Sequence, residues 1–81
     1  MPQWRRSAIL QTSIVMQVHV NGTDVVLEAS TSVAGLLERL KVKPQAIVLE
    51  HNGAILLREK WGETILQEKD KVEIVSFVGG G

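Results

Sequence analysis

The C-terminal glycines are the residues of this sequence whose chemistry is most informative. Gly79, Gly80 and Gly81 end the chain, directly after a run rich in apolar residues. Because glycine has no Cβ, three in succession form a thin backbone that reaches conformations closed to other residues. Such a backbone can enter a narrow enzyme channel and present its end. We therefore predict that residues 79–81 form a flexible tail whose reactive group is the α-carboxylate of Gly81.

Other reactive groups are scarce, which strengthens this prediction. The sequence has no cysteine, which excludes disulfides, cysteine-ligated zinc and a persulfide held on a side chain. His19 and His51 have no neighbours at metal-ligand or catalytic spacing, and we interpret them as surface and turn residues. Adenylation of Gly81 would give a mixed anhydride with a good leaving group, open to a sulfur nucleophile. The alternative interpretation of the tail is a cloning scar or a frayed end.

Length and charge favour a carrier or binding module over an enzyme. A chain of 81 residues forms at most one domain, and a domain of this size buries only about 60% of its unfolded surface. Lys and Arg number 9 and Asp and Glu number 9, so the formal net charge is zero and nucleic acid is not an expected partner. No apolar run approaches the roughly 18 residues that span a bilayer, so we expect no membrane association.

The first half of the sequence predicts a hairpin and a helix. Residues 16–20 alternate apolar and polar, as a strand with one buried face does. Asn21-Gly22 is typical of a type I′ turn, so we expect strands near 16–20 and 24–28. A helical apolar stripe follows, capped by Thr31 or Ser32 and ended near Pro44. The stripe consists of Val33, Leu36, Leu37 and Leu40. Gly35 inside this helix indicates a close approach to the sheet.

The second half predicts strands at 46–50, 54–57 and 71–78, with irregular chain over 58–70. In that irregular segment Ile65 and Leu66 are expected to form a turn pinned to the core, and Trp61 to pack at the core edge. The first and last strands are the natural parallel pair because the helix supplies their crossover. We predict an α+β fold over residues 16–78, a ubiquitin-like β-grasp with a mixed four- to five-stranded sheet packed on one helix.

The last predicted strand places two apolar side chains on the open side of the sheet. Glu73 is expected to face solvent, because a lone glutamate is rarely fully buried. Val75 and Phe77 share its face, since side chains alternate along a strand. Exposed apolar groups beside a reactive tail suggest a partner-binding face. The alternative is that a loop or the N-terminal segment covers them.

Residues 1–15 are set apart from the rest of the chain by their composition. They contain Arg5 and Arg6 and no acidic residue, and polar residues interrupt their apolar stretches. This is a poor secretory signal and at most a weak transit peptide. We interpret the segment as a disordered extension or as the product of a start codon placed too early, with Met16 as the functional start.

The stretch from Met16 to Gly81 resembles the ThiS family of sulfur carriers in thiamine biosynthesis, which is related to the MoaD family. The matching segments are MQVHVNG, SVAGLLERL, AIVLEHNGAIL and LQEKDKVEIVSFVGGG. The resemblance implies a cytoplasmic protein that binds no cofactor and catalyses nothing alone. An E1-like adenylyltransferase of the ThiF type, using ATP and Mg²⁺, would activate Gly81. A sulfurtransferase or cysteine desulfurase would supply sulfur to form a thiocarboxylate, which a thiazole synthase of the ThiG type would consume.

Two other functions remain open on the sequence. The small subunit of molybdopterin synthase has a similar fold and also ends in Gly-Gly, although its first strand is usually longer than the one predicted here. A ubiquitin-like modifier or interaction domain without sulfur chemistry is the third possibility. Only the carrier and the modifier require a free carboxylate at Gly81.

Overall fold

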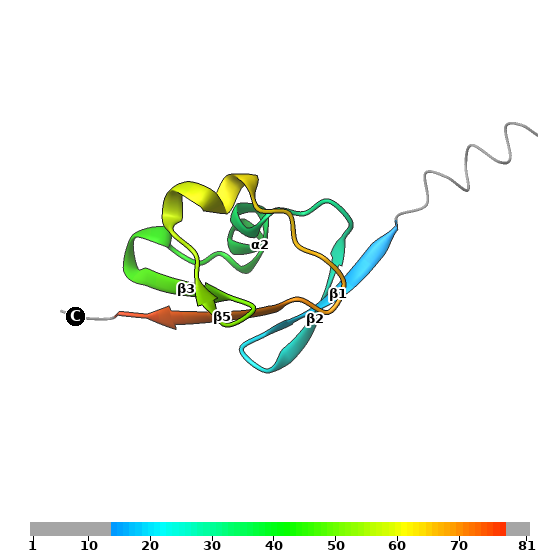
Figure 1. Ribbon diagram of the computed structural model, residues 1–81, viewed down its shortest axis with the longest axis horizontal. Helices are drawn as coiled ribbons and strands as arrows, with labels where there is room; N and C mark the ends of the chain where they lie inside the picture. The colour runs from blue at the N-terminus through cyan, green and yellow to red at the C-terminus, as the bar shows by residue number, and fades with distance from the viewer. Residues whose placement is uncertain (1–13, 78–81) are drawn as a thin grey trace, which may run out of the picture.

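Five strands form one mixed sheet in the order β2-β1-β5-β3-β4 (Figure 1). The structure is a computed structural model that describes residues 14–77. β1 and β5 run parallel at the centre of the sheet, as predicted, and the other neighbouring strands are antiparallel. Within residues 14–77, the predicted α+β fold, with a mixed sheet and one α-helix, is confirmed. The strands are β1 (Val15–Val20), β2 (Thr23–Glu28), β3 (Ile47–His51), β4 (Ala54–Ile55) and β5 (Lys71–Ser76).

Both tight turns of the sheet use the same backbone conformation. Asn21 and Gly22, between β1 and β2, have φ angles of 50° and 82°. Asn52 and Gly53, between β3 and β4, have φ angles of 52° and 89°. Positive φ at both central residues is what a type I′ hairpin turn requires. The predicted first hairpin is therefore confirmed.

The sheet begins one residue earlier than predicted. Val15, which we assigned to the N-terminal extension, opens β1 and pairs with Glu28. The pairing extends this far because the Ile14 carbonyl accepts a hydrogen bond from the Ala29 N–H at 2.8 Å. The rest of the extension, residues 1–13, lies outside the described residues.

Helix α2 (Val33–Leu40) carries the predicted apolar stripe and cap. The Ser32 hydroxyl accepts a hydrogen bond from the Gly35 N–H at 3.0 Å, which satisfies one of the free donors of the first turn. The helix ends at Lys41, whose φ of 59° is left-handed, three residues before Pro44. The prediction that Gly35 approaches the sheet is wrong. A Cβ there would meet the Thr31 methyl group at 3.3 Å, so the close neighbour is the helix's own N-terminal turn.

The core lies between α2 and one face of the sheet, with the 3₁₀ helix η2 (Arg58–Glu63) closing its edge (Figure 1). Trp61 is buried there, as predicted, and its Nε1–H donates to the Leu56 carbonyl at 2.9 Å. Ile65 and Leu66 are both predicted to be pinned to the core. Leu66 is buried, as predicted, but Ile65 is exposed. The fully buried side chains are those of Val18, Leu27, Val33, Leu36, Leu49 and Val72.

Two strands are shorter than predicted. β4 contains only Ala54 and Ile55, because the chain turns into η2 after Leu57. β5 ends at Ser76, because its partner β3 begins at Ile47 after the short 3₁₀ helix η1 (Pro44–Ala46). Among residues 14–77, no helix has the length and the apolar character needed to span a bilayer.

Candidate docking face beside the C-terminal tail

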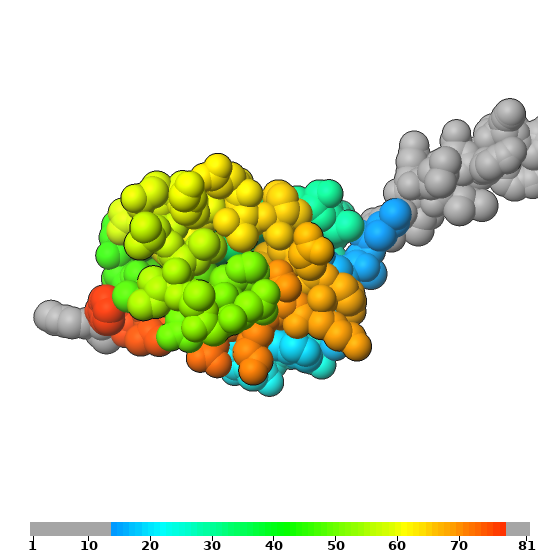
Figure 2. Space-filling view, in the orientation of Figure 1, coloured from blue at the N-terminus to red at the C-terminus, as the bar shows by residue number. Residues whose placement is uncertain are grey.

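The central strand β5 leads directly to the glycine tail. β5 is paired with β1 on one side and β3 on the other. Its pairing continues to Phe77, whose N–H donates to the Ala46 carbonyl at 2.7 Å. The end of β5 lies at the surface beside residues of the β3 and β4 region (Figure 2). The three predicted tail residues, Gly79, Gly80 and Gly81, lie outside the described residues.

Four apolar side chains share the open face of the sheet at this end. On β5 and just beyond it, Val75 and Phe77 are 51% and 55% exposed, which confirms the predicted exposure. Val48 on β3 lies directly opposite Val75, and Ile55 on β4 lies opposite Glu50 of the same face. We term this set the tail-side patch: Val48, Ile55, Val75 and Phe77.

Sequence reasoning missed half of the tail-side patch. Val48 lies within the apolar run Ala46–Leu49, in which no alternation separates the buried face from the open face. Ile55 was placed in a strand without a face assigned to it. The register supplies this information, since directly opposed residues of paired strands share a face. The tail-side patch is made of side chains from three neighbouring strands, and exposed apolar patches of this kind mark interaction sites.

A hydrogen-bonded network fixes the loop that precedes β5. Asp70 Oδ2 accepts from His51 Nε2 at 2.8 Å and from the Gln67 N–H at 3.0 Å, while its Oδ1 accepts from Asn52 Nδ2 at 3.1 Å. Asn52 Oδ1 in turn accepts from the Lys71 N–H at 2.8 Å. The interpretation of His51 as a turn residue is therefore wrong. It is the last residue of β3, and it ties that strand to the loop before β5.

The same network determines the charge state of Asp70. Burial alone would raise the pKa of Asp70, since its side chain is only 12% exposed. The hydrogen bonds from His51, Asn52 and the Gln67 amide, with the attraction of His51, together outweigh burial and lower the pKa below 3.8. Asp70 is thus held as a carboxylate at neutral pH and anchors the start of β5.

The other histidine has no such connection to the core. His19 lies on the open face of β1 and pairs through Nδ1 with Asp24, its cross-strand neighbour on β2. Its side chain is 40% exposed, so the predicted surface position is confirmed. Across residues 14–77, no group of three or more metal-ligating side chains lies together. In this part of the chain, neither histidine belongs to a cluster that could hold a metal ion.

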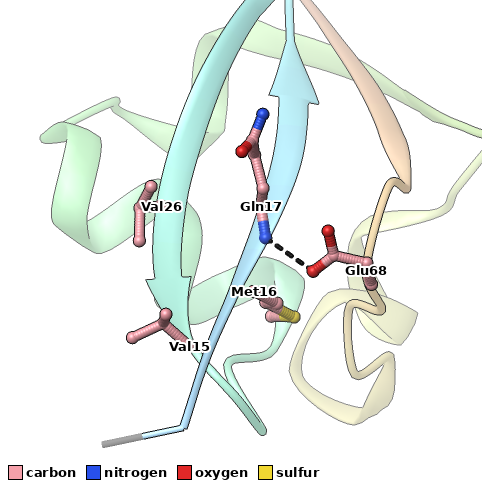
Figure 3. Close-up of a pocket in the computed structure, with 5 residues that line it drawn as sticks. All are labelled: Val15, Met16, Gln17, Val26 and Glu68. Atoms are coloured by element: carbon pink, nitrogen blue, oxygen red, sulfur yellow. Dashed lines mark hydrogen bonds between the residues drawn. The ribbon is translucent and has the colours of Figure 1, made fainter.

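A groove of about 220 Å³ lies at the far end of β1 from the tail-side patch (Figure 3). Glu68 closes one side of it by accepting a hydrogen bond from the Gln17 N–H at 2.9 Å. This contact replaces a backbone partner, because β5 pairs with β1 only at His19 and Val20. Apart from Glu68, the residues that line the groove have no ionisable side chain. The lining consists of Val15, Met16, Gln17, Val26 and Glu68.

Comparison with known proteins identifies some relatives that this chain matches over nearly their whole length and others that it matches over only a part. The sulfur carrier protein ThiS of Bacillus subtilis (strain 168) is 34% identical over 65 residues, which are 79% of this chain and 98% of that protein. A thiazole synthase of Magnetococcus marinus is 41% identical over 66 residues, which are 82% of this chain. The chain spans only 20% of the length of that synthase, and 20% of a second one from Paramagnetospirillum magneticum.

A solved structure and a family profile agree with these relatives. The crystal structure of the thiamine biosynthesis protein ThiS from Geobacter metallireducens superimposes with a TM-score of 0.69 at 35% sequence identity. The superposition covers 82% of this chain and 100% of that one. The profile of the ThiS family matches residues 15–81, from the first residue of β1 to the glycine tail. The chain therefore belongs to the ThiS family.

Proposed function

We propose that this chain is a sulfur carrier of thiamine biosynthesis and not itself an enzyme. The single observation that carries the proposal is the placement of the tail-side patch, where the central strand ends and the glycine tail follows. An exposed apolar surface beside a side-chain-free tail suits a protein that is held by one surface while its end is modified. Membership of the ThiS family supports the same function.

The proposed chemistry begins at the carboxylate of Gly81. One of its oxygens attacks the α-phosphate of ATP, with Mg²⁺, in the site of a ThiF-type E1-like adenylyltransferase, and pyrophosphate leaves. The acyl-adenylate is then attacked at its carbonyl carbon by the outer sulfur of a persulfide, which a sulfurtransferase or cysteine desulfurase carries. AMP departs with the electron pair of the C–O bond, and an acyl disulfide to the sulfur-donating enzyme forms. Thiols reduce its S–S bond and are themselves oxidised to a disulfide, which leaves the thiocarboxylate on Gly81. Gly79 and Gly80 give the tail a backbone narrow enough to reach that site.

We propose a ThiG-type thiazole synthase as the acceptor of the sulfur. Two relatives that carry the name thiazole synthase contain a segment similar to this chain, and the 66 matched residues make up 20% of each. A carrier segment joined to a synthase keeps the two at a high effective concentration. We propose that this chain delivers its sulfur to a synthase of the same kind.

The tail-side patch is the proposed docking surface for the adenylyltransferase. Val75 and Phe77 lie closest to the tail in sequence and are both more than half exposed. Aromatic side chains in the centre of an interface commonly contribute most of the binding energy. We therefore assign Phe77 as the principal contact and Val75 as its neighbour.

The test is an intact-mass measurement on the purified chain after incubation with the E1-like enzyme, ATP, Mg²⁺ and a sulfur donor. Replacement of one oxygen by sulfur at Gly81 is the expected product, and a variant that lacks residues 80–81 is the matched control. Conjugation to a lysine of another protein would instead indicate a ubiquitin-like modifier. Delivery of the sulfur to a molybdopterin precursor, and not to thiazole synthase, would indicate the molybdopterin pathway. No mass change, or sulfur transfer from a chain with an amidated C-terminus, would contradict the proposal.

A further inference from the structure

Two carboxylates lie directly opposite one another in the middle of the open face. Glu50 on β3 pairs with Glu73 on β5 in the antiparallel register. Directly opposed side chains have Cβ atoms about 4.5–5.5 Å apart, and like charges in this arrangement destabilise the sheet. In the strand registers of residues 14–77, this is the only pair of opposed carboxylates.

No Lys, Arg or His side chain of the described residues forms an ion pair with either glutamate. The ion pairs among residues 14–77 are His19 with Asp24, His51 with Asp70, and Lys60 with Glu63. Lys71 shares the open face of β5 with Glu73 and forms none of them. Neither glutamate side chain accepts a hydrogen bond from a residue of this range. Residues 14–77 therefore hold these two carboxylates opposite one another with neither an ion-pair partner nor a hydrogen-bond donor.

The pair lies inside the tail-side patch and not on a separate surface. Val48 and Val75 form the next cross-strand pair of this face towards the tail, and Ile55 lies opposite Glu50 on β4. Glu73 is exposed and Glu50 is half-buried, so both carboxylates are within reach of a partner. Any protein that covers the patch must also cover these two charges, and burial of unpaired charges is strongly unfavourable.

We infer that the adenylyltransferase places a lysine or arginine side chain between Glu50 and Glu73 while its apolar groups cover the tail-side patch. The inference rests on the proposed function. One cation between the two carboxylates would attract both of them and offset their mutual repulsion. The patch therefore favours a partner with a positive charge at this position. A partner without that cation would bury both carboxylates unpaired, which makes the glutamates specificity determinants. Complementary charges of this kind act mainly on the association rate and on the choice of partner.

The test uses charge-neutral variants of nearly unchanged size. Glu50→Gln, Glu73→Gln and the double variant remove the charges, and Glu28→Gln is the matched control. Glu28 is exposed and lies opposite Val15, at the far end of the open face. Association rates are measured at low and high salt against the E1-like enzyme that adenylates the wild-type chain and, separately, against the thiazole synthase. Thermal unfolding midpoints are measured in parallel.

The double variant is expected to associate about tenfold more slowly at low salt and to lose most of its salt dependence. Its unfolding midpoint is expected to equal or exceed that of the wild type, because a repulsion has been removed. Weaker binding with unchanged or higher stability is a combination that a merely structural role does not produce. Glu28→Gln is expected to leave the association rate unchanged.

Three outcomes overturn the inference. They are equal rates for the double variant and the wild type, an equal loss in Glu28→Gln, and a lower midpoint that accounts for the weaker binding. A loss confined to the thiazole synthase overturns the choice of partner. Failure of the wild-type chain to be adenylated is separate, since it refutes the proposed function itself. Adenylation of the wild type with no effect of either glutamate refutes only the cation contact.

Discussion

The N–H of Phe77 donates a hydrogen bond to the Ala46 carbonyl at 2.7 Å, one position beyond the last residue of β5. The backbone of Phe77 is therefore held by the sheet, while the residue stays 55% exposed. A side chain on a fixed backbone loses less freedom on binding than one on a mobile segment. This arrangement makes Phe77 the strongest candidate for an anchor of the tail-side patch.

Phe77→Asp is expected to weaken binding of the adenylyltransferase by about tenfold or more, because an interfacial aromatic anchor is replaced by a charge. The unfolding free energy should change by less than about 1 kcal/mol, because the residue is exposed. Binding is measured by titration of the enzyme, and stability by urea unfolding. Val26→Asp is the control, since Val26 is 53% exposed on the edge strand β2, away from the patch. Wild-type thiocarboxylation in Phe77→Asp would contradict the assignment.

The lowered pKa of Asp70 predicts that the domain loses stability in acid. This pKa lies below 3.8 because hydrogen bonds from His51, Asn52 and Gln67 outweigh the effect of burial, so the folded state keeps the carboxylate ionised to lower pH than the unfolded chain. The resulting stabilisation is complete above the unfolded pKa and is lost as pH falls through the folded pKa.

Asp70→Asn should therefore be less stable than the wild type at pH 7, by about 1–3 kcal/mol, because the charged acceptor of three hydrogen bonds is lost. The difference should shrink as pH falls below the ordinary pKa of an aspartate and through the lower pKa of Asp70 in the folded state, where the wild-type carboxylate takes up its proton. Urea unfolding of both proteins at a series of pH values measures this difference. A difference that does not depend on pH would show that the ionised state of Asp70 is not what stabilises the loop.

Trp61→Phe is expected to destabilise the domain by about 1–3 kcal/mol, because the Leu56 carbonyl loses its partner inside the structure. The bond from Trp61 Nε1 to that carbonyl is 2.9 Å long, and Trp61 is only 5% exposed. Circular dichroism during urea unfolding gives the measurement. Leu57→Ala is the comparison: Leu57 is 58% exposed, so an equal loss there would show that the tryptophan contact is not special.

Ser32→Ala should lower the unfolding free energy by about 1 kcal/mol, because α2 loses its N-cap. The bond concerned joins the Ser32 hydroxyl to the Gly35 N–H at 3.0 Å. Ser32→Asp should restore most of the stability, since a carboxylate is an equally good cap and favours the positive end of the helix. Chemical denaturation of the wild type and the two variants gives their free energies of unfolding. An equal decrease in both variants would contradict a capping role.

Local patterns in the sequence predicted the elements that have strong local signals. The Asn21-Gly22 turn, the stripe from Val33 to Leu40 and the alternation after Met16 each identify an element within a few residues. The parallel pairing of β1 with β5 also followed, because the order of the elements leaves few arrangements. These parts of the fold depend on local conformation and on connectivity, both of which a single sequence contains.

The features that were missed depend on contacts between distant residues. His51 and Asp70 are 19 residues apart in sequence, and nothing near either one indicates that the pairing of β3 with β5 brings them together. The polar segment before Thr64 has no apolar period, yet it forms η2, because the burial of Trp61 and its bond to Leu56 hold it. Val48 and Ile55 become part of a surface only through the strand register. The exposed face of Val75 and Phe77 could be predicted because side chains alternate along a strand and Glu73, on the same face, is expected to contact solvent.

The position of β5 between two neighbours determines how the domain responds when an enzyme grips its end. A pull on Phe77 along the strand acts against the bonds to β1 and β3 together, so they must shear at the same time instead of opening one after another. An edge strand would peel away from one neighbour under the same load. The topology therefore gives the tail-side patch a mechanically resistant base for the docking proposed above.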